Sequence, residues 1–250
     1  MTPKISALAI TYNEECNIKR FMEQLSFADE IVLVDSYSTD KTVEIAQLMG
    51  AKVVQRSFDD FSSQRNFALT QTQNDWILFL DLDELISENF INEVKNTLQN
   101  TQNVAFFAKR TFFFMGKHIR FGGWQTDKAI RVLNKNFCTY NGNLVHETVS
   151  CKGETAVLKT SIDHFSYKDF DTYNSKLTLY SKLQAKNLYA KKVKPHAYHF
   201  FIRPLYRFLW QYIYRLGFLD GKTGFILAYV HAFSVFKRYL QLWMMYRKIE

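Results

Sequence analysis

Short apolar runs alternate with amphipathic segments along the first third of the chain. Uninterrupted apolar character of this kind is typical of strands buried in a parallel sheet. The predicted strands are residues 5–10, 30–36, 51–57 and 76–83. Segment 38–50 places apolar residues at helical positions, and Gly50 is a suitable stop for it. Segment 61–72 is expected to be a capped helix. The alternation predicts an α/β fold with a parallel sheet.

Polar residues at the starts of two predicted helices suggest how those helices begin. Asn13 is the expected N-cap of the first helix, with Glu14 and Glu15 in its first turn. Ser38 or Thr39 is the expected cap of the next one. The run 104–119, which is rich in Phe, predicts a buried strand followed by a hairpin.

Three polar segments follow predicted strands directly, at residues 11–14, 35–40 and 81–84. In parallel sheets, ligands bind at the carboxyl ends of the strands, so these segments are expected to meet at one site. The chain has neither a GxGxxG nor a Walker A sequence, which argues against a dinucleotide or P-loop site. The sequence therefore predicts a ligand site built mainly from carboxylates.

The carboxylates suggest a nucleotide and a metal. An ionised Asp35 accepts hydrogen bonds and suits a base or a ribose. Asp81 and Asp83 form a D-x-D at a strand end and suit one hard cation, Mg²⁺ or Mn²⁺, which also binds phosphate oxygens. The alternative is that these residues only cap turns and helices. Their alignment with Asp35 on neighbouring strands favours the binding site.

These segments resemble a family 2 glycosyltransferase, a nucleotide-sugar enzyme of GT-A fold. The resemblance rests on "AITYNEECNI", "EIVLVDSYSTDKTVEIAQLMGAKV", "FSSQRNFAL" and "DWILFLDLDE". The later segments "GGWQTDKAIRVL", "VHE" and "DHFSYKDFDTYNSKL" resemble bacterial glucosyltransferases of the lipopolysaccharide inner core. A D-A-D-E motif is common in that branch, and here Leu82 stands in place of the alanine.

The resemblance implies roles on the donor side. A GT-A sheet flanked by helices would bind a UDP-sugar, UDP-glucose in the branch that the chain resembles. A divalent cation, Mg²⁺ or Mn²⁺, would lie against the diphosphate. The implied nucleotide-sugar residues are Thr11, Asn13, Glu14, Asp35, Ser38, Arg65 and Asp81, and the implied metal ligands are Asp81, Asp83 and His164. The alternatives are an exposed helix charge for Arg65 and a structural histidine at 164.

The resemblance also implies roles on the acceptor side. Asp127, placed ahead of a helix that contains Arg131, is the expected general base, and Glu147 is its competitor. Trp124, Arg131 and His146 are candidates for contacts with the acceptor or with phosphate. Trp124 follows two glycines and either stacks on a sugar or is a core residue.

Charge separates the last third from the rest. Residues 1–164 have a net charge of −3 and residues 165–250 one of +11. Residues 195–250 combine arginines with many aromatics, and Leu205, Phe208 and Tyr212 recur at helical spacing opposite Arg203, Arg207, Gln211 and Arg215. We expect amphipathic helices in a membrane interface, or alternatively packed on the catalytic domain or on a second subunit. No nucleic-acid-binding module accompanies the charge, so nucleic acid is not an expected partner.

Together these observations predict a catalytic domain of residues 1–180 and a basic, aromatic helical extension of residues 181–250. The three cysteines show no CxxC spacing and are expected to be reduced thiols in a cytoplasmic protein. The N-terminus has no signal-peptide pattern. The expected activity is inverting transfer of a hexose, glucose above all, to heptose of the lipopolysaccharide inner core at the cytoplasmic face of the inner membrane. The alternatives are a polyprenyl-phosphate or protein acceptor, or a non-catalytic adaptor; a homo-oligomer is also considered.

Overall fold

The computed structural model describes residues 3–141, 148–167 and 169–249. The chain forms two compact units, each built from two segments. The first unit contains Met1–Arg110 and Lys128–His164, and the second contains Thr111–Asp127 and Phe165–Glu250. The predicted boundary between residues 180 and 181 stays a prediction; the compact units place 165–180 with the helices that follow.

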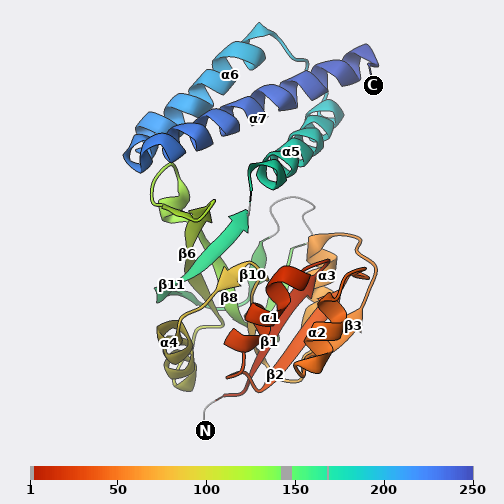
Figure 1. The fold of residues 1–250 in the computed structure, drawn as a ribbon, viewed down its shortest axis with the longest axis vertical. Coiled ribbons are helices and arrows are strands. Elements are labelled where there is room, and N and C mark those ends of the chain that lie inside the picture. The colour runs from red at the N-terminus through yellow and green to blue at the C-terminus, as the bar shows by residue number, and fades with distance from the viewer. Residues whose placement is uncertain (1–2, 142–147, 168, 250) are drawn as a thin grey trace. The chain divides into compact units, whose positions relative to one another are not determined.

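The first unit is built on a mixed sheet (Figure 1). Its strands follow the order β3-β2-β1-β4-β8-β6-β11-β5. β1, β2, β3 and β4 pair in parallel, and β8 joins β4 and β6 in antiparallel fashion. The strand bounds are β1 Ile5–Thr11, β2 Glu30–Asp35, β3 Lys52–Gln55, β4 Trp76–Phe79, β5 Glu84–Leu85, β6 Ala105–Phe114, β8 Lys128–Asn134 and β11 Thr155–Tyr167. The four strands predicted for the first third are all present.

Helices cover both faces of this sheet. The helix bounds are α1 Glu15–Gln24, α2 Thr42–Leu48, α3 Phe61–Thr70 and α4 Glu88–Gln99. Phe21 of α1 and Phe90 of α4 are fully buried in the cluster on one face. Leu69 of α3 lies in the cluster on the other face with Phe79 and Tyr140. The parallel part of the sheet thus has a buried apolar cluster on each face.

Two of the predicted helix caps are wrong. α1 begins after Glu14 and α2 after Lys41, and neither helix has a side-chain cap. The Asn13 side chain instead accepts a hydrogen bond from the Thr39 backbone N–H, and the Ser38 hydroxyl bonds to Asp35. These polar atoms tie two strand-end loops together, so they are not available to the helix starts.

Between residues 104 and 134, strands occupy residues 105–114, 117–119 and 128–134. β6 continues into the second unit and pairs there with β7, Lys117–Ile119, so the predicted hairpin is confirmed. The predicted helix around Arg131 is wrong, because Arg131 lies in β8 between β4 and β6. Its neighbours Ile130, Val132 and Leu133 are buried, as suits a central strand.

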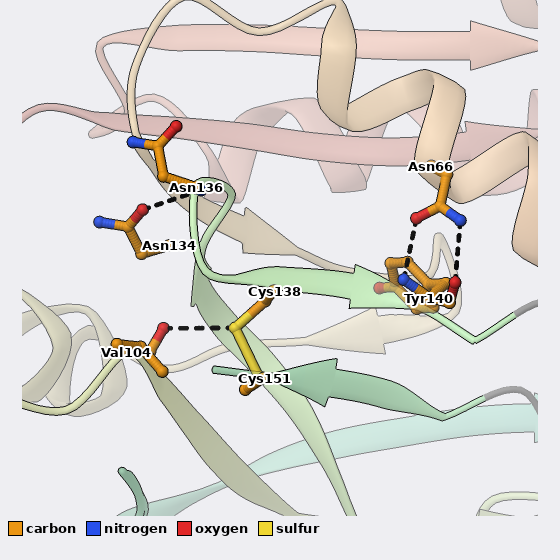
Figure 2. The surroundings of a disulfide bond; sticks show 7 residues. All are labelled: Asn66, Val104, Asn134, Asn136, Cys138, Tyr140 and Cys151. Carbon is orange, nitrogen blue, oxygen red and sulfur yellow. Dashed lines mark hydrogen bonds between the residues drawn. A yellow bond between two sulfur atoms is a disulfide. The ribbon is translucent and has the colours of Figure 1, made fainter. Parts of the chain in front are cut away.

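A disulfide joins the short antiparallel strands β9, Cys138–Tyr140, and β10, Val149–Cys151 (Figure 2). Cys138 and Cys151 are directly opposite, with Cα atoms 4.2 Å apart. The prediction of reduced thiols is therefore wrong for this pair, because strand pairing brings together cysteines that are 13 residues apart in sequence. Cys16 is free and exposed.

The second unit is mainly helical. It contains η1 Trp124–Thr126, α5 Phe170–Ala190, α6 Ala197–Leu209, the π-helical η2 Trp210–Tyr214, η3 Gly217–Asp220 and α7 Gly221–Arg247. α5 and α6 both lie alongside α7 (Figure 1). None of the helices in the described ranges has both the length and the apolar character that a membrane span requires.

On α6 and η2 the predicted apolar face is largely exposed, whereas the predicted polar face is partly buried. Gln211, on the predicted polar face, is only 1% exposed, and Arg207 is half-buried against α7. Phe201 and Leu205 are 72% and 54% exposed. Of the predicted polar face, Arg203 is exposed, Arg207 and Arg215 are half-buried and Gln211 is buried. The exposed apolar side chains suit the predicted membrane interface, which stays a prediction.

Candidate functional site

The ends of β1 and β2 form one polar cluster in the first unit. Thr11 pairs with Asp35 in the parallel register. Asp35 is fully buried, and its carboxylate accepts hydrogen bonds from the Ser38 backbone N–H at 2.9 Å and from the Gln55 side chain at 3.2 Å. The Ser38 hydroxyl donates to the other carboxylate oxygen. The carboxylate is therefore fixed in position from two sides.

The loop after β1 is bonded to the loop after β2. The Asn13 backbone N–H donates to the Ser38 hydroxyl at 2.8 Å, and the Glu14 backbone N–H donates to Thr42 Oγ1 at 2.8 Å. The Thr11 side chain is 4% exposed, and its hydroxyl has no hydrogen-bond partner among the described residues. The structure thus brings together the predicted nucleotide residues of these two strands.

Asp81, which follows β4, is held by two arginines. Arg65 Nη2 of α3 lies 3.1 Å from Asp81 Oδ1, and Arg131 Nη2 of β8 lies 2.5 Å from Oδ2. Arg131 also donates to Glu84 Oε1, at 2.5 Å from Nη2 and 3.2 Å from Nε. Arg110 Nη1 lies 3.7 Å from the same Glu84 oxygen. Three arginines and two carboxylates therefore form one network at the end of β4.

Burial and the neighbouring charges in this network shift the pKa values of Asp81, Glu84 and Arg131. Burial by itself would raise the pKa of Asp81, but the charges of Arg131 and Arg65 outweigh it and hold that pKa well below its usual range. Burial raises the pKa of Glu84 and outweighs the opposing charge of Arg131. The neighbouring Asp81 charge raises this pKa further. Burial would lower the pKa of Arg131, but Asp81 and Glu84 raise it instead. Asp81 is thus firmly ionised and neutralised by arginine.

Arg65 is positioned by aromatic rings as well as by Asp81. Its guanidinium lies 5.5 Å from the ring centroids of both Phe79 and Tyr140. The Asn66 side chain fixes Tyr140, since it donates to the Tyr140 carbonyl and accepts from the Tyr140 N–H (Figure 2). The α3 helix is therefore anchored to β9, and Arg65 is 13% exposed rather than a free surface charge.

Asp83 differs from Asp81 in its partners. Asp83 Oδ2 lies 3.4 Å from His164 Nε2, and Asp83 Oδ1 is buried with no hydrogen-bond partner in the described parts of the chain. His164 is positioned by the antiparallel pairing of β11 with β5, where it is opposite Glu84. A carboxylate and an imidazole are suitable ligands for Mn²⁺. Groups of three or more potential metal-binding side chains are absent from the described residues.

The remaining candidates lie elsewhere in the chain. Trp124 and Asp127 belong to the second unit, where the Asp127 N–H donates to the Trp124 carbonyl at 2.9 Å. Trp124 stacks on Phe112 with ring centroids 4.9 Å apart. His146 and Glu147 lie outside the described residues.

Sequence reasoning missed several residues of the site. Arg110 had no predicted role, and its only signal was a charge inside an otherwise apolar strand. Tyr12 and Tyr37 also had none, although they are 58% and 53% exposed beside the Asp35 loop. Tyr37 adopts a φ of 61°, which is uncommon for a bulky residue and marks this loop as specially shaped.

Comparison with known proteins identifies the family. The model of "Glycosyl transferase family 2" matches residues 6–162. The chain belongs to this family. An "Uncharacterized glycosyltransferase" of Rickettsia bellii is 30% identical over 97% of this chain and 87% of its own length. The "Lipopolysaccharide core biosynthesis glycosyltransferase LpsC" of Rhizobium meliloti is 25% identical over 96% of this chain and 95% of its own.

Solved structures match less of this family 2 glycosyltransferase. A glucosyl-3-phosphoglycerate synthase from Mycobacterium tuberculosis, crystallised with Mn²⁺, UDP and glucosyl-3-phosphoglycerate, is 23% identical, with a TM-score of 0.38 over 44% of each chain. The predicted fold class, an α/β nucleotide-sugar-binding sheet of GT-A type with C-terminal helices, is confirmed. The predicted enzyme class, glycosyltransferase, is confirmed as well.

Proposed function

We propose that the protein transfers a hexose, glucose above all, from a UDP-sugar to heptose of the lipopolysaccharide inner core, with inversion. The observation that carries the proposal is the position of Asp35, Asp81 and Asp83 at the carboxyl ends of β2 and β4, the two parallel neighbours of β1. Arg65 pairs there with Asp81, and His164 lies beside Asp83. The full-length similarity to LpsC, whose name places it in lipopolysaccharide core biosynthesis, supports the acceptor class.

On the donor side, Asp35 would accept hydrogen bonds from the uracil or the ribose, with Thr11, Asn13, Glu14 and Ser38 lining the pocket. Asp35 is already fixed by its two partners, so little ordering would be needed when the nucleotide binds. We assign Arg131 a positioning role instead of a phosphate contact, because it is 4% exposed and bonded to two carboxylates.

Asp83 and His164 fit a divalent cation, Mg²⁺ or Mn²⁺. Asp83 presents a buried oxygen without a partner, which is a costly arrangement that a cation would relieve. Asp81 is already neutralised by arginines, so we place the cation on Asp83 and His164 and leave Asp81 to orient Arg65 toward the diphosphate. The cation would offset charge on the departing diphosphate. Asp127 would accept the proton of the acceptor hydroxyl, with Glu147 as the competing base.

The second unit supports a site of action on a membrane surface. Many large apolar side chains of α6, η2, η3 and α7 are more than 40% exposed, among them Phe201, Leu205, Ile213, Phe218 and Tyr229. A groove of about 410 Å³ opens among them between α6 and α7, lined by Leu205, Phe208, Phe225, Tyr229 and Phe233 with three further residues. An apolar surface of this extent on a strongly basic segment suits a bilayer with anionic lipids.

We place the enzyme at the cytoplasmic face of the inner membrane, where a nucleotide sugar and a lipid-bound acceptor would both be accessible. The Cys138–Cys151 disulfide stands against this compartment, because disulfides are rare in the cytosol. An acceptor built on polyprenyl phosphate or on protein would fit the same donor site. A non-catalytic adaptor would not require the ionised cluster around Asp81.

Titration calorimetry with UDP-glucose and Mn²⁺, followed by a transfer assay, tests the function. Asp83→Asn should lose metal-dependent UDP-sugar binding, since an amide is a weaker ligand than a carboxylate. Asp127→Asn should keep that binding but lose transfer by about 100-fold or more, the usual contribution of a positioned base. A wild-type protein that binds no UDP-sugar with metal would contradict the proposal, and full activity of Asp83→Asn would contradict the metal assignment.

A further inference from the structure

The second unit contains an arginine that is half-buried between helices. Arg207 of α6 points at α7, where its Nη2 lies 2.9 Å from His231 Nδ1. Burial lowers the pKa of Arg207, with the Arg215 charge acting in the same direction and Tyr173 opposing. Arg207 nevertheless remains charged, because guanidinium does not lose its proton in proteins.

This charge has no carboxylate partner. In the described part of the second unit, Arg203, Arg207, Arg215 and Arg238 form no ion pair. Asp220 accepts hydrogen bonds from the Arg120 and Phe121 N–H groups, and Asp169 accepts one from the Thr172 N–H. Because buried charges are normally paired, an unpaired and half-buried guanidinium is suited to bind an anion.

Gln211 provides a second, independent observation. It lies one turn after Arg207 and is 1% exposed, and neither its amide nitrogen nor its amide oxygen has a hydrogen-bond partner in the described residues. Buried amides are nearly always bonded, and leaving one unbonded costs free energy. The Gln211 side chain therefore has hydrogen-bonding capacity that a ligand would use.

Gln211 and His231, the partner of Arg207, both lie close to Trp124. A Cβ on Gly122 would lie 3.6 Å from Gln211 Cγ and 3.0 Å from the Trp124 ring, so Gln211 and Trp124 flank the same glycine. The ring centroids of Trp124 and His231 are 5.6 Å apart. Burial and the Arg207 charge keep His231 neutral by lowering its pKa, so Nδ1 accepts from Arg207 and Nε2 carries the proton. A guanidinium, an amide and an imidazole N–H thus cluster beside an aromatic ring.

We propose that Arg207, Gln211 and His231 bind an oxyanion, a phosphate or a carboxylate, on the acceptor saccharide while Trp124 contacts its sugar ring. The proposal rests on the proposed function and adds the substrate class, an acceptor that carries a negative charge. The planar donor fork of arginine suits either oxyanion. Relief of the unpaired charge and of the unbonded amide would make the anionic acceptor preferred over a neutral one.

The test measures saccharide binding to the full chain by titration calorimetry, without donor. The probes are a neutral heptose disaccharide, the same disaccharide with one phosphate monoester, and the same disaccharide with one ulosonic-acid carboxylate. Wild type should bind one charged form about tenfold more tightly or better than the neutral form, the effect of one charge-assisted hydrogen bond. The form that is preferred identifies the oxyanion.

Three variants test which residues cause the preference for the charged saccharide. Arg207→Gln should remove it, whereas Arg247→Gln, which deletes the same charge from an exposed position near the end of α7, should keep it. Gln211→Met should weaken the preference and yet leave the melting temperature unchanged or raised, because it replaces an unbonded buried amide by an apolar group of similar shape. If Gln211 served only in packing, its replacement would not weaken the preference for the charged saccharide while leaving the melting temperature unchanged or raised. If Arg207→Gln fails to fold, the result for Gln211→Met decides the test.

Four results would overturn the proposal: equal binding of the three probes by wild type, a preference that survives in Arg207→Gln, an unchanged preference in Gln211→Met, or a fall in the melting temperature of Gln211→Met. Loss of binding to phosphatidylglycerol vesicles in Arg207→Gln, with the three saccharides bound alike, would assign the cluster to a lipid headgroup and overturn it too. A charge preference without transfer from any UDP-sugar would leave this site standing and remove the proposed function.

Discussion

At the scale of single residues, two aspartates separated by one position have different environments. The sequence predicted that Asp81 and Asp83 lie at a strand end, and they do. It could not predict that Arg131, 50 positions later, would bond Asp81 and Glu84, because an ion pair between distant strands leaves no local pattern. The assumed helix at Arg131 also hid the contact, since the residue is on a strand beside β4.

Removing the Arg131 guanidinium should unfold the first unit more easily. Arg131→Met leaves Asp81 and Glu84 without their shared partner, and breaking a buried pair typically costs about 3–5 kcal/mol. Urea denaturation measures the loss. Arg56→Met is the matched control, because Arg56 pairs with the exposed Asp59 and should cost far less. Equal losses in the two variants would show that the Arg131 network adds no stability.

His231 should make stability depend on pH. Arg207 of α6 and Tyr173 of α5 face it, with Trp124 beside the ring. Burial, with the Arg207 charge, lowers the pKa of His231 to about 3 from 6.5. Below about pH 6.5 the unfolded chain binds a proton that the folded chain excludes, so stability falls by up to about 1.4 kcal/mol per pH unit.

The measurement is the free energy of unfolding between pH 7.5 and 5, for wild type and for His231→Gln. The variant cannot titrate at this position, so its loss of stability on acidification should be smaller. Groups such as Asp81 are common to both proteins and cancel in the comparison. Parallel pH profiles would mean that His231 titrates normally in the folded state.

At the scale of elements, the pattern of apolar residues predicted whether a segment forms a helix or a strand. It predicted less well which face of the element is buried. The parallel strands and α3 were predictable because their apolar residues are contiguous or regularly spaced. In α6 the spacing shows two faces but not which one is buried, because that depends on what α7 presents. Arg207 turns inward to His231, and Gln211 is buried beside the loop at Gly122 without a hydrogen-bond partner in the described residues. Likewise, Asn13 and Ser38 bond between loops instead of capping helices.

The disulfide of the β9–β10 hairpin should contribute to stability. Closing a loop of this length restricts the unfolded chain and is expected to contribute about 2–4 kcal/mol. The Cys138→Ser, Cys151→Ser double variant should therefore melt at a lower temperature than the oxidised wild type. Dithiothreitol should lower the melting temperature of wild type but not of the variant. If the reductant has no effect on wild type, the bond is absent or contributes nothing to stability. An absent bond, shown by titration of three free thiols, would remove the conflict with a cytoplasmic location.

At the scale of the whole molecule, the chain separates its chemistry by unit. The residues proposed for the donor and the cation belong to the first unit, whereas Trp124, Asp127 and the basic helices belong to the second. The charge asymmetry predicted a distinct role for the last third of the chain. It could not show how many large apolar side chains share this basic surface, since that follows from the orientation of α6.

This orientation changes how membrane binding should be tested. Reversing the charge of Arg207 would disturb a half-buried contact, so a loss of binding would be ambiguous. Phe201, Leu205 and Ile213 are at least half exposed, so replacing all three by glutamine should leave the fold intact.

The triple variant should bind phosphatidylglycerol vesicles about 100-fold more weakly at 0.15 M salt, at about 1 kcal/mol for each partly inserted side chain. Leu48→Gln is the control, since Leu48 is 81% exposed but lies in the first unit. Raising the salt should weaken binding of the wild type further, because the basic residues act through a screened attraction. Equal sedimentation of the triple variant and wild type with vesicles would contradict the membrane proposal. A wild-type dimer in vesicle-free solution that the triple variant fails to form would then assign the exposed surface to a second copy of the chain.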